Sequence, residues 1–70
     1  MKVGARNKIE AEVTQIKKGD VMCAVKVKLS GTDIMMSSVM TTDSLDEMSI
    51  KVGDKVHVYA KAVNVLLGKD

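Results

Sequence analysis

Apolar side chains occupy every second position from residue 21 to residue 29, with lysines between them at positions 26 and 28. Because alternate side chains of a β-strand point to opposite faces, this pattern predicts a strand with one face in the core and one in solvent. The apolar face consists of Val21, Cys23, Val25, Val27 and Leu29. This is the clearest strand pattern in the chain, and it predicts β-structure for the centre of the sequence.

Shorter alternations and apolar runs predict four more strands, at residues 9–13, 34–40, 55–60 and 63–67. Turn-forming residues separate the strands at 17–20, 30–33 and 52–54. Residues 41–44, Thr41-Thr42-Asp43-Ser44, offer several N-cap candidates, and Ser44 followed by Glu47 fits a capping box for one short helical turn that ends at Met48, between the third and fourth strands. Five short strands with a helical turn in this place predict an all-β fold, an OB-like Greek-key barrel.

The length of 70 residues allows one domain, residues 1–70, with a thin core. Cys23 is the only cysteine, so neither an intrachain disulfide nor a cysteine-based zinc site can stabilise it. Association with further copies is the remaining way to stabilise so small a domain. The apolar fraction of 46% contains a single aromatic residue, Tyr59, and consists otherwise of aliphatic side chains and methionines that suit strands and subunit contacts.

The chain lacks a signal-peptide pattern and any run of about 18 apolar residues that could cross a membrane, which indicates a cytoplasmic protein. Catalytic residues are scarce: there is one histidine, no glycine-rich phosphate loop and no paired carboxylates in an apolar setting. We expect His57 to be a solvated surface residue and Cys23 to be a buried, inert thiol. An enzyme and a protein-bound metal site are therefore not predicted.

Two segments carry donors that suit an anion. Arg6, the only arginine, has a planar guanidinium that can hold two oxygens of one anion, and Asn7 follows it. Lys61 interrupts an apolar stretch and stands beside the small Ala62, which would let an anion approach backbone N–H groups. Arg6 and Lys61 could equally be solvated surface cations, and spacing alone does not decide between this interpretation and an anion site.

Four motifs in this order resemble the Mop family of molbindins, whose module is also called the TOBE domain, over nearly the whole chain. The motifs are Ala5-Arg6-Asn7, Lys17-Lys18-Gly19, Thr42-Asp43-Ser44 and Lys61-Ala62-Val63-Asn64-Val65. The resemblance implies an OB-like barrel that assembles as a homohexamer, a trimer of dimers, and stores or buffers molybdate or tungstate in the cytoplasm. It places the oxyanion sites between subunits.

Carried over to this chain, the resemblance implies one class of oxyanion site formed by Ala5, Arg6, Lys61 and Ala62, with Thr41 and Ser44 as further candidates. A second class, near a three-fold axis, would involve Lys18, Gly19, Asp20 and Val21, although the Asp20 carboxylate would repel a dianion unless it points away. Most family members have serine where this chain has Gly4 and Ala62. Loss of these hydroxyls suggests a tungstate-preferring variant.

Two other functions remain possible from the sequence. An OB barrel is a common platform for single-stranded nucleic acid, but such proteins stack bases on aromatic side chains, and Tyr59 alone offers little to stack on. A purely structural assembly module would also explain the apolar strands. Oxyanion binding is the function we predict, with no nucleic-acid or membrane partner.

Overall fold

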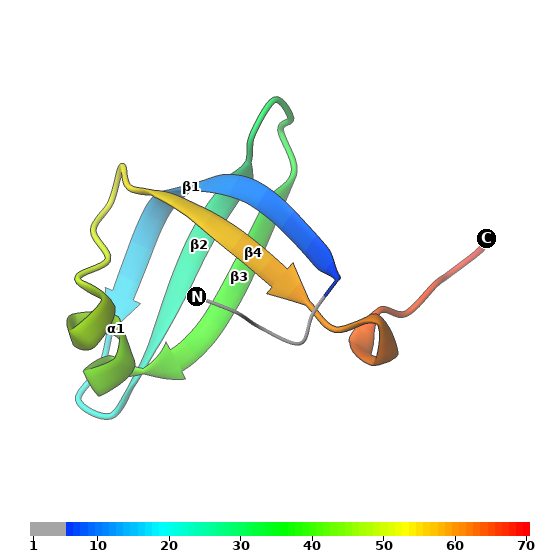
Figure 1. Ribbon diagram of the computed structural model, residues 1–70. Helices are drawn as coiled ribbons and strands as arrows, with labels where there is room; N and C mark the ends of the chain where they lie inside the picture. Colours follow the sequence, from blue (N-terminus) through cyan, green and yellow to red (C-terminus); the bar gives the residue numbers. More distant parts are fainter. Residues whose placement is uncertain (1–5) are drawn as a thin grey trace.

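The computed structural model describes residues 6–70, and these contain four β-strands, one α-helix and one short 3-10 helix (Figure 1). The strands are β1 (Asn7–Lys18), β2 (Met22–Leu29), β3 (Met35–Thr41) and β4 (Lys55–Ala60). The helix α1 (Thr42–Met48) joins β3 to β4, and the 3-10 helix η1 (Ala62–Asn64) follows β4.

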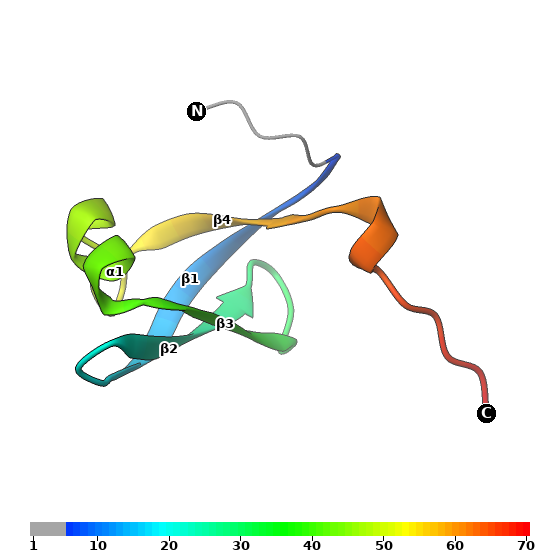
Figure 2. The same ribbon diagram turned by 90° about the horizontal axis from the view of Figure 1, so that it is seen from below.

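The four strands form one antiparallel sheet in the order β3-β2-β1-β4. The sheet is strongly curled (Figures 1 and 2). Its two outer strands, β3 and β4, form the two sides of a concave face, and the two central strands, β1 and β2, form the back. The predicted all-β class, with one short helix between the third and fourth strands, is confirmed. Within residues 6–70 the sheet is not closed, because the outer edges of β3 and β4 have no strand beside them.

The first strand is longer than the alternation predicted. It extends to Lys18, and an irregularity between Val13 and Gln15 makes Thr14 an extra residue in the ladder with β2. Because a β-bulge shifts the inward-facing positions by one residue, the apolar series continues from Val13 to Ile16 instead of to position 15. The strict alternation therefore stops at Val13, and the predicted turn at residues 17–20 began two residues too early.

The other predicted turns lie where expected. Residues 30–33 connect β2 to β3, with the Leu29 N–H donating to the Ile34 carbonyl at 2.9 Å and Gly31 at a φ of 77°. Gly53, at a φ of 95°, forms the turn before β4, and its N–H donates to the Val13 carbonyl at 2.8 Å. Glycine is favoured at both positions because it has no Cβ to clash in the left-handed region.

The helix begins earlier than predicted. Thr41, not Ser44, is the N-cap: its hydroxyl accepts a hydrogen bond from the Ser44 N–H at 3.1 Å, three residues into the helix. Thr42 and Leu45 are buried and attach the helix to the sheet. The prediction of a capping box from Ser44 to Glu47 was wrong because Thr41 sits directly at the end of β3, where the chain changes direction.

The predicted fifth strand at residues 63–67 is absent from the described chain. Residues 62–64 form η1, and residues 65–70 extend away from the sheet without regular structure (Figures 1 and 2). Val63 is 85% exposed, Leu66 90% and Leu67 95%. An apolar segment forms a strand only where it meets an unpaired strand edge, and no such edge of its own sheet lies along this segment.

The core is thin, as the chain length predicted. Its buried apolar side chains come mainly from the inner face of β1 and β2, with Leu45 added by α1: Ala11, Val13, Cys23, Val25, Val27, Leu29 and Leu45. Cys23 is buried and His57 is exposed, as expected. Val21, predicted on the inner face, is 71% exposed because it lies in the turn before β2. In residues 6–70 no helix has the length and apolar character needed to traverse a bilayer.

Candidate functional site

The antiparallel pairing of β1 with β4 brings the two predicted cationic segments together. Asn7 is the first residue of β1 and pairs with Ala60, the last residue of β4. The Asn7 side chain strengthens this pair, since its Nδ2 donates to the Ala60 carbonyl at 3.0 Å. Arg6 precedes Asn7 and Lys61 follows Ala60, so the two cations, 55 positions apart in sequence, flank the same end of the sheet. We call this the Arg6–Lys61 end.

Donors at the Arg6–Lys61 end are available to a ligand. Arg6, Lys61 and Ala62 are all exposed, and among residues 6–70 neither cation is in a salt bridge. Two cations at the same end of the sheet, without a carboxylate partner among residues 6–70, favour an anion, and an arginine fork suits its oxygens. Ala5, the remaining candidate of this class, lies outside the described residues.

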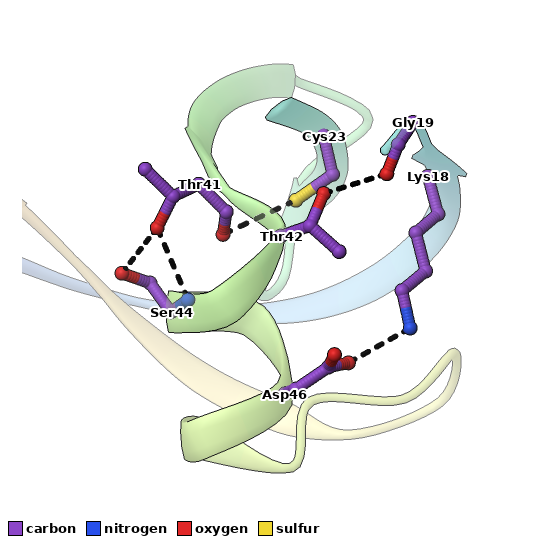
Figure 3. A network of polar contacts seen from close by, with 7 residues as sticks. All are labelled: Lys18, Gly19, Cys23, Thr41, Thr42, Ser44 and Asp46. Carbon is purple, nitrogen blue, oxygen red and sulfur yellow. Dashed lines mark hydrogen bonds and ion pairs between the residues drawn. The ribbon is translucent and has the colours of Figure 1, made fainter. Parts of the chain in front are cut away.

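Thr41 and Ser44 lie at the other end of the sheet, where β3 meets α1. Their side chains are already engaged with each other: the Thr41 hydroxyl donates to Ser44 Oγ at 2.8 Å while it accepts the Ser44 N–H (Figure 3). Cys23 Sγ donates weakly to the Thr41 carbonyl at 3.9 Å. In this arrangement the hydroxyls of Thr41 and Ser44 form the N-terminal cap of α1.

The turn after β1 packs against the same helix (Figure 3). The buried Thr42 hydroxyl donates to the Gly19 carbonyl at 2.7 Å, and the Thr42 N–H donates to the Val21 carbonyl at 2.8 Å. Lys18 Nζ lies 2.8 Å from Asp46 Oδ1. The predicted second-class residues, Lys18, Gly19, Asp20 and Val21, are therefore brought together with Thr41 and Ser44. We call this group the turn–helix end.

Lys18 already forms a salt bridge with Asp46 at the turn–helix end. Its hydrogen bond to Asp46, followed by the charge of that carboxylate, raises the pKa of the Lys18 ammonium. Lys18 remains about half exposed, with a side-chain exposure of 51%. A ligand at this end would compete with Asp46 for the ammonium, whereas Arg6 and Lys61 face no such competition within residues 6–70.

The two ends are far apart in one chain. β1 runs from the Arg6–Lys61 end to the turn–helix end over 12 residues. A strand rises about 3.3 Å per residue, so the two ends are separated by on the order of 30 Å. Arg6 and Lys61 from one chain can meet Thr41 and Ser44 only if these come from another chain.

Thr42 and Asn7 are structural residues of these ends that the sequence did not single out as such. Thr42 is 8% exposed, and its hydroxyl holds the Gly19 turn against α1. The run Thr41-Thr42-Asp43-Ser44 indicates a helix start in the sequence. Only the packing shows that Thr41 is the N-cap and that Thr42 is buried. Among residues 6–70 no group of three His, Cys, Asp or Glu side chains is arranged to hold a metal ion.

Known proteins show the same fold and sequence pattern. The TOBE domain matches residues 4–67. The chain belongs to the TOBE-domain family. Its curated relatives include molybdenum-pterin-binding proteins 3 and 2 of Clostridium pasteurianum, each 28% identical over 67 residues, which cover 96% of this chain and 97% of each relative.

Solved structures place this TOBE domain among the Mop proteins. A molybdate-binding protein from Sporomusa ovata is 36% identical, with a TM-score of 0.87, over 99% of this chain and 100% of its own. MopII from Clostridium pasteurianum, in an apo form, is 26% identical, with a TM-score of 0.88, over 97% of this chain and 100% of its own. The predicted family is thereby confirmed.

Proposed function

We propose that this TOBE-domain protein binds a tetrahedral metal oxyanion, molybdate or tungstate, in sites shared between identical subunits, and that it stores or buffers the anion in the cytoplasm. The observation that carries the proposal is the Asn7–Ala60 pair, which holds Arg6 and Lys61 at one end of the sheet without a carboxylate partner among residues 6–70. The names of the Clostridium and Sporomusa relatives support molybdenum chemistry for the family.

Assembly is part of this proposal. We propose a homohexamer, a trimer of dimers, in which the Arg6–Lys61 end of one subunit contributes cations and main-chain donors, with Ala5 and Ala62, and a neighbour contributes Thr41 and Ser44. The separation of the two ends in one chain supports sites of this kind. A second class of site would use the turn of Lys18, Gly19, Asp20 and Val21, where Asp46 already occupies the ammonium of Lys18.

The protein is proposed to bind and not to catalyse. Tetrahedral oxyanions can be held entirely by N–H and O–H donors, and the exposed groups at the Arg6–Lys61 end are of this kind. A nucleic-acid function has less support, because base stacking needs several aromatic surfaces and Tyr59 is the only aromatic residue of the chain.

Calorimetric titration of the assembled protein with molybdate and with tungstate tests the proposal. We expect saturable binding that Arg6→Ala weakens by about tenfold or more, because a charge-assisted hydrogen bond contributes roughly 1.5–3 kcal/mol. Lys26→Ala removes one positive charge from a strand interior away from both ends and serves as the matched control. Equal affinity in the parent and in Arg6→Ala would show that the assigned site is wrong.

Thermal melting with different anions tests the selectivity. A ligand that binds only the native assembly stabilises it by about 2.7 kcal/mol at a hundredfold excess over its dissociation constant. We expect molybdate and tungstate to raise the melting temperature much more than sulfate, whose smaller tetrahedron leaves some donors unpaired. Equal shifts with all three anions would contradict a site built for metal oxyanions.

A further inference from the structure

The outer face of the sheet, opposite the core, carries two polar residues beside the Arg6–Lys61 end. The β1–β4 register pairs Lys8 with Tyr59, one step inside the last pair of the ladder. Exposure alternates along β4: residues 55, 57 and 59 are exposed, and the residues between them are partly buried. Directly opposite residues of an antiparallel pair point to the same side, so Lys8 and Tyr59 share the outer face.

Lys61 continues this face beyond the end of β4. It lies two residues after Tyr59, and its backbone stays extended, with a φ of −68° and a ψ of 138°. Arg6 in turn precedes Lys8 by two residues. Residues two apart in a strand are separated by about 7 Å, a distance that the four-carbon stem of a lysine can span. The Lys8 ammonium can therefore reach an anion held at the Arg6–Lys61 end.

The ammonium of Lys8 is available for such an anion. Lys8 is exposed, and within residues 6–70 it forms no salt bridge. The lysines that do form salt bridges in this part of the chain are Lys18, Lys28 and Lys55. Three cations gathered at one corner of a sheet repel one another, and an anion between them removes that repulsion.

Tyr59 adds a donor of a different kind. It is 39% exposed, and its ring lies against the ring of His57, with the centroids 6.2 Å apart and the planes tilted by 50°. Among the hydrogen bonds made within residues 6–70, none uses the Tyr59 hydroxyl. A phenol can donate its O–H to an oxyanion, whereas the neighbouring Ala62 offers no hydroxyl.

The next row of the same face ends this cationic region. Glu10 is paired with His57, two residues further along each strand. Beyond it, the Glu12 carboxylate lies 2.7 Å from the Lys55 ammonium. Because a carboxylate repels a dianion, an oxyanion site at this end can extend along the ladder to the row of Lys8 and Tyr59 and no further.

We propose that Lys8 and Tyr59 are further ligand-binding residues of the Arg6–Lys61 end, and that Lys8 contributes a third positive charge and Tyr59 a directional O–H donor to one tetrahedral dianion. The inference rests on the proposed function, whose site it extends by one row of the sheet. The ladder and the His57 ring fix the position of the Tyr59 side chain. Its hydroxyl therefore reaches the oxygens of molybdate and tungstate better than those of the smaller sulfate.

The fluorescence of Tyr59 reports directly on this site, because the chain contains no tryptophan and no other tyrosine. The assembled parent protein is titrated with molybdate and with tungstate while the tyrosine emission is recorded. We expect a saturable change whose midpoint agrees with the calorimetric dissociation constant. Calorimetric binding without any change in the emission would overturn the role of Tyr59.

Tyr59→Phe tests the hydroxyl alone, since the ring against His57 is kept. We expect the affinity for molybdate to fall about threefold, as for the loss of one neutral hydrogen bond, and the affinity for sulfate to change little. A parallel loss for both anions would contradict a role in selectivity. An unchanged affinity for molybdate would remove Tyr59 from the site.

Lys8→Met tests the third charge, since it keeps the length of the side chain. We expect the affinity for molybdate to fall about fivefold at low ionic strength and less at high ionic strength, because exposed charges are screened by salt. Lys26→Met, on the outer face of β2, removes the same charge away from the Arg6–Lys61 end and is the matched control. Equal losses in the two variants would show that only the net charge matters.

Glu10→Gln tests the boundary of the site with the opposite sign. Removal of the nearest carboxylate of this face should raise the affinity for molybdate about twofold at low ionic strength. Glu47→Gln, on α1, removes the same charge at the other end of the sheet and should leave the affinity unchanged. A lower or unchanged affinity in Glu10→Gln would contradict an anion beside Lys8.

The same titrations separate this inference from the proposed function. If Arg6→Ala weakens binding while Lys8→Met and Tyr59→Phe bind as the parent does, the inference is overturned and the proposed function stands. If the parent binds neither molybdate nor tungstate, both are overturned. Far-UV circular dichroism verifies that each variant is folded.

Discussion

Asn7 and Ala60 form the pair that closes one end of the β1–β4 ladder, with the Asn7 amide donating to the Ala60 carbonyl at 3.0 Å. This cross-strand contact links residues 53 positions apart and, with the rest of the β1–β4 ladder, brings the flanking Arg6 and Lys61 to the same end of the sheet. The oxyanion site proposed here therefore depends on a residue that need not touch the anion.

Asn7→Ala should weaken oxyanion binding modestly. Loss of one exposed hydrogen bond costs about 1 kcal/mol, which allows this end of the ladder to open and lowers the apparent affinity by up to about fivefold. Calorimetric titration with molybdate measures the change. Thr14→Ala removes a comparable exposed side-chain bond to the Lys26 carbonyl and should leave the affinity unchanged. Equal losses in both variants would mean that the Asn7 contact has no special role.

Ala62→Ser should shift the anion preference toward molybdate. The substitution adds one hydroxyl donor at an exposed position and little volume, so the assembly should be unaffected. Competition titration with molybdate and tungstate compares the ratio of their affinities in the variant and the parent. An unchanged ratio would show that the absence of this hydroxyl does not set any preference for tungstate.

Thr42→Val should destabilise the fold by about 1–3 kcal/mol, because it keeps the side-chain shape but removes the donor to the Gly19 carbonyl. Urea denaturation measures the free energy of unfolding. Thr14→Val, at an exposed position whose hydroxyl makes a longer bond of 3.2 Å, is the control and should change it by about 0.5 kcal/mol or less. A neutral Thr42→Val would mean that water replaces the lost donor.

Gly19→Ala should also destabilise the fold. A Cβ at this position would lie 2.7 Å from the Met22 carbonyl oxygen, so the turn that packs on α1 must shift. We expect a loss of about 1–3 kcal/mol in the free energy of unfolding, as for other overpacked sites. Gly68→Ala meets no atom within 4 Å and is the control. Similar melting temperatures for both variants would contradict the close approach.

Lys55→Met should raise the pKa of the Glu12 carboxyl toward its ordinary value. The hydrogen bond from Lys55, followed by its charge, lowers that pKa in the folded protein. A carboxyl with a lowered folded pKa stabilises the protein above its unfolded pKa, and this contribution is lost as the pH falls through the folded value. NMR titration of the Glu12 side chain detects the change, while Lys51→Met, in a loop, should leave the Glu12 titration as it is.

The strand pattern was predictable where it depended on periodicity alone. The inner face of β2, with Cys23, Val25, Val27 and Leu29, is buried as the alternation indicated. The same rule failed at Thr14, because a bulge inserts a residue without changing the local composition. The capping pattern misplaced the helix start for a different reason: Thr41 and Ser44 are equally good capping residues, and only the end of β3 selects Thr41.

The fifth strand shows why an apolar run does not identify its own partner. Residues 63–67 have the composition of a strand, yet their side chains are exposed because η1 turns the backbone away from the sheet. A strand is defined by the main-chain edge it pairs with, and within residues 6–70 this segment is not part of the sheet. Sequence periodicity carries no information about which edge a segment meets.

The sequence by itself determined the β-class, the position of the helix between the third and fourth strands, and the family, because alternation, turn residues and motif order are local properties of the chain. Only the tertiary structure decided which of these segments meet. The antiparallel register of β1 and β4 placed Arg6 and Lys61 at the same end of the sheet, and the length of β1 kept both away from Thr41 and Ser44. Register depends on main-chain hydrogen bonds and on how side chains fill the core, so contacts across 53 positions become visible only when the sheet has formed.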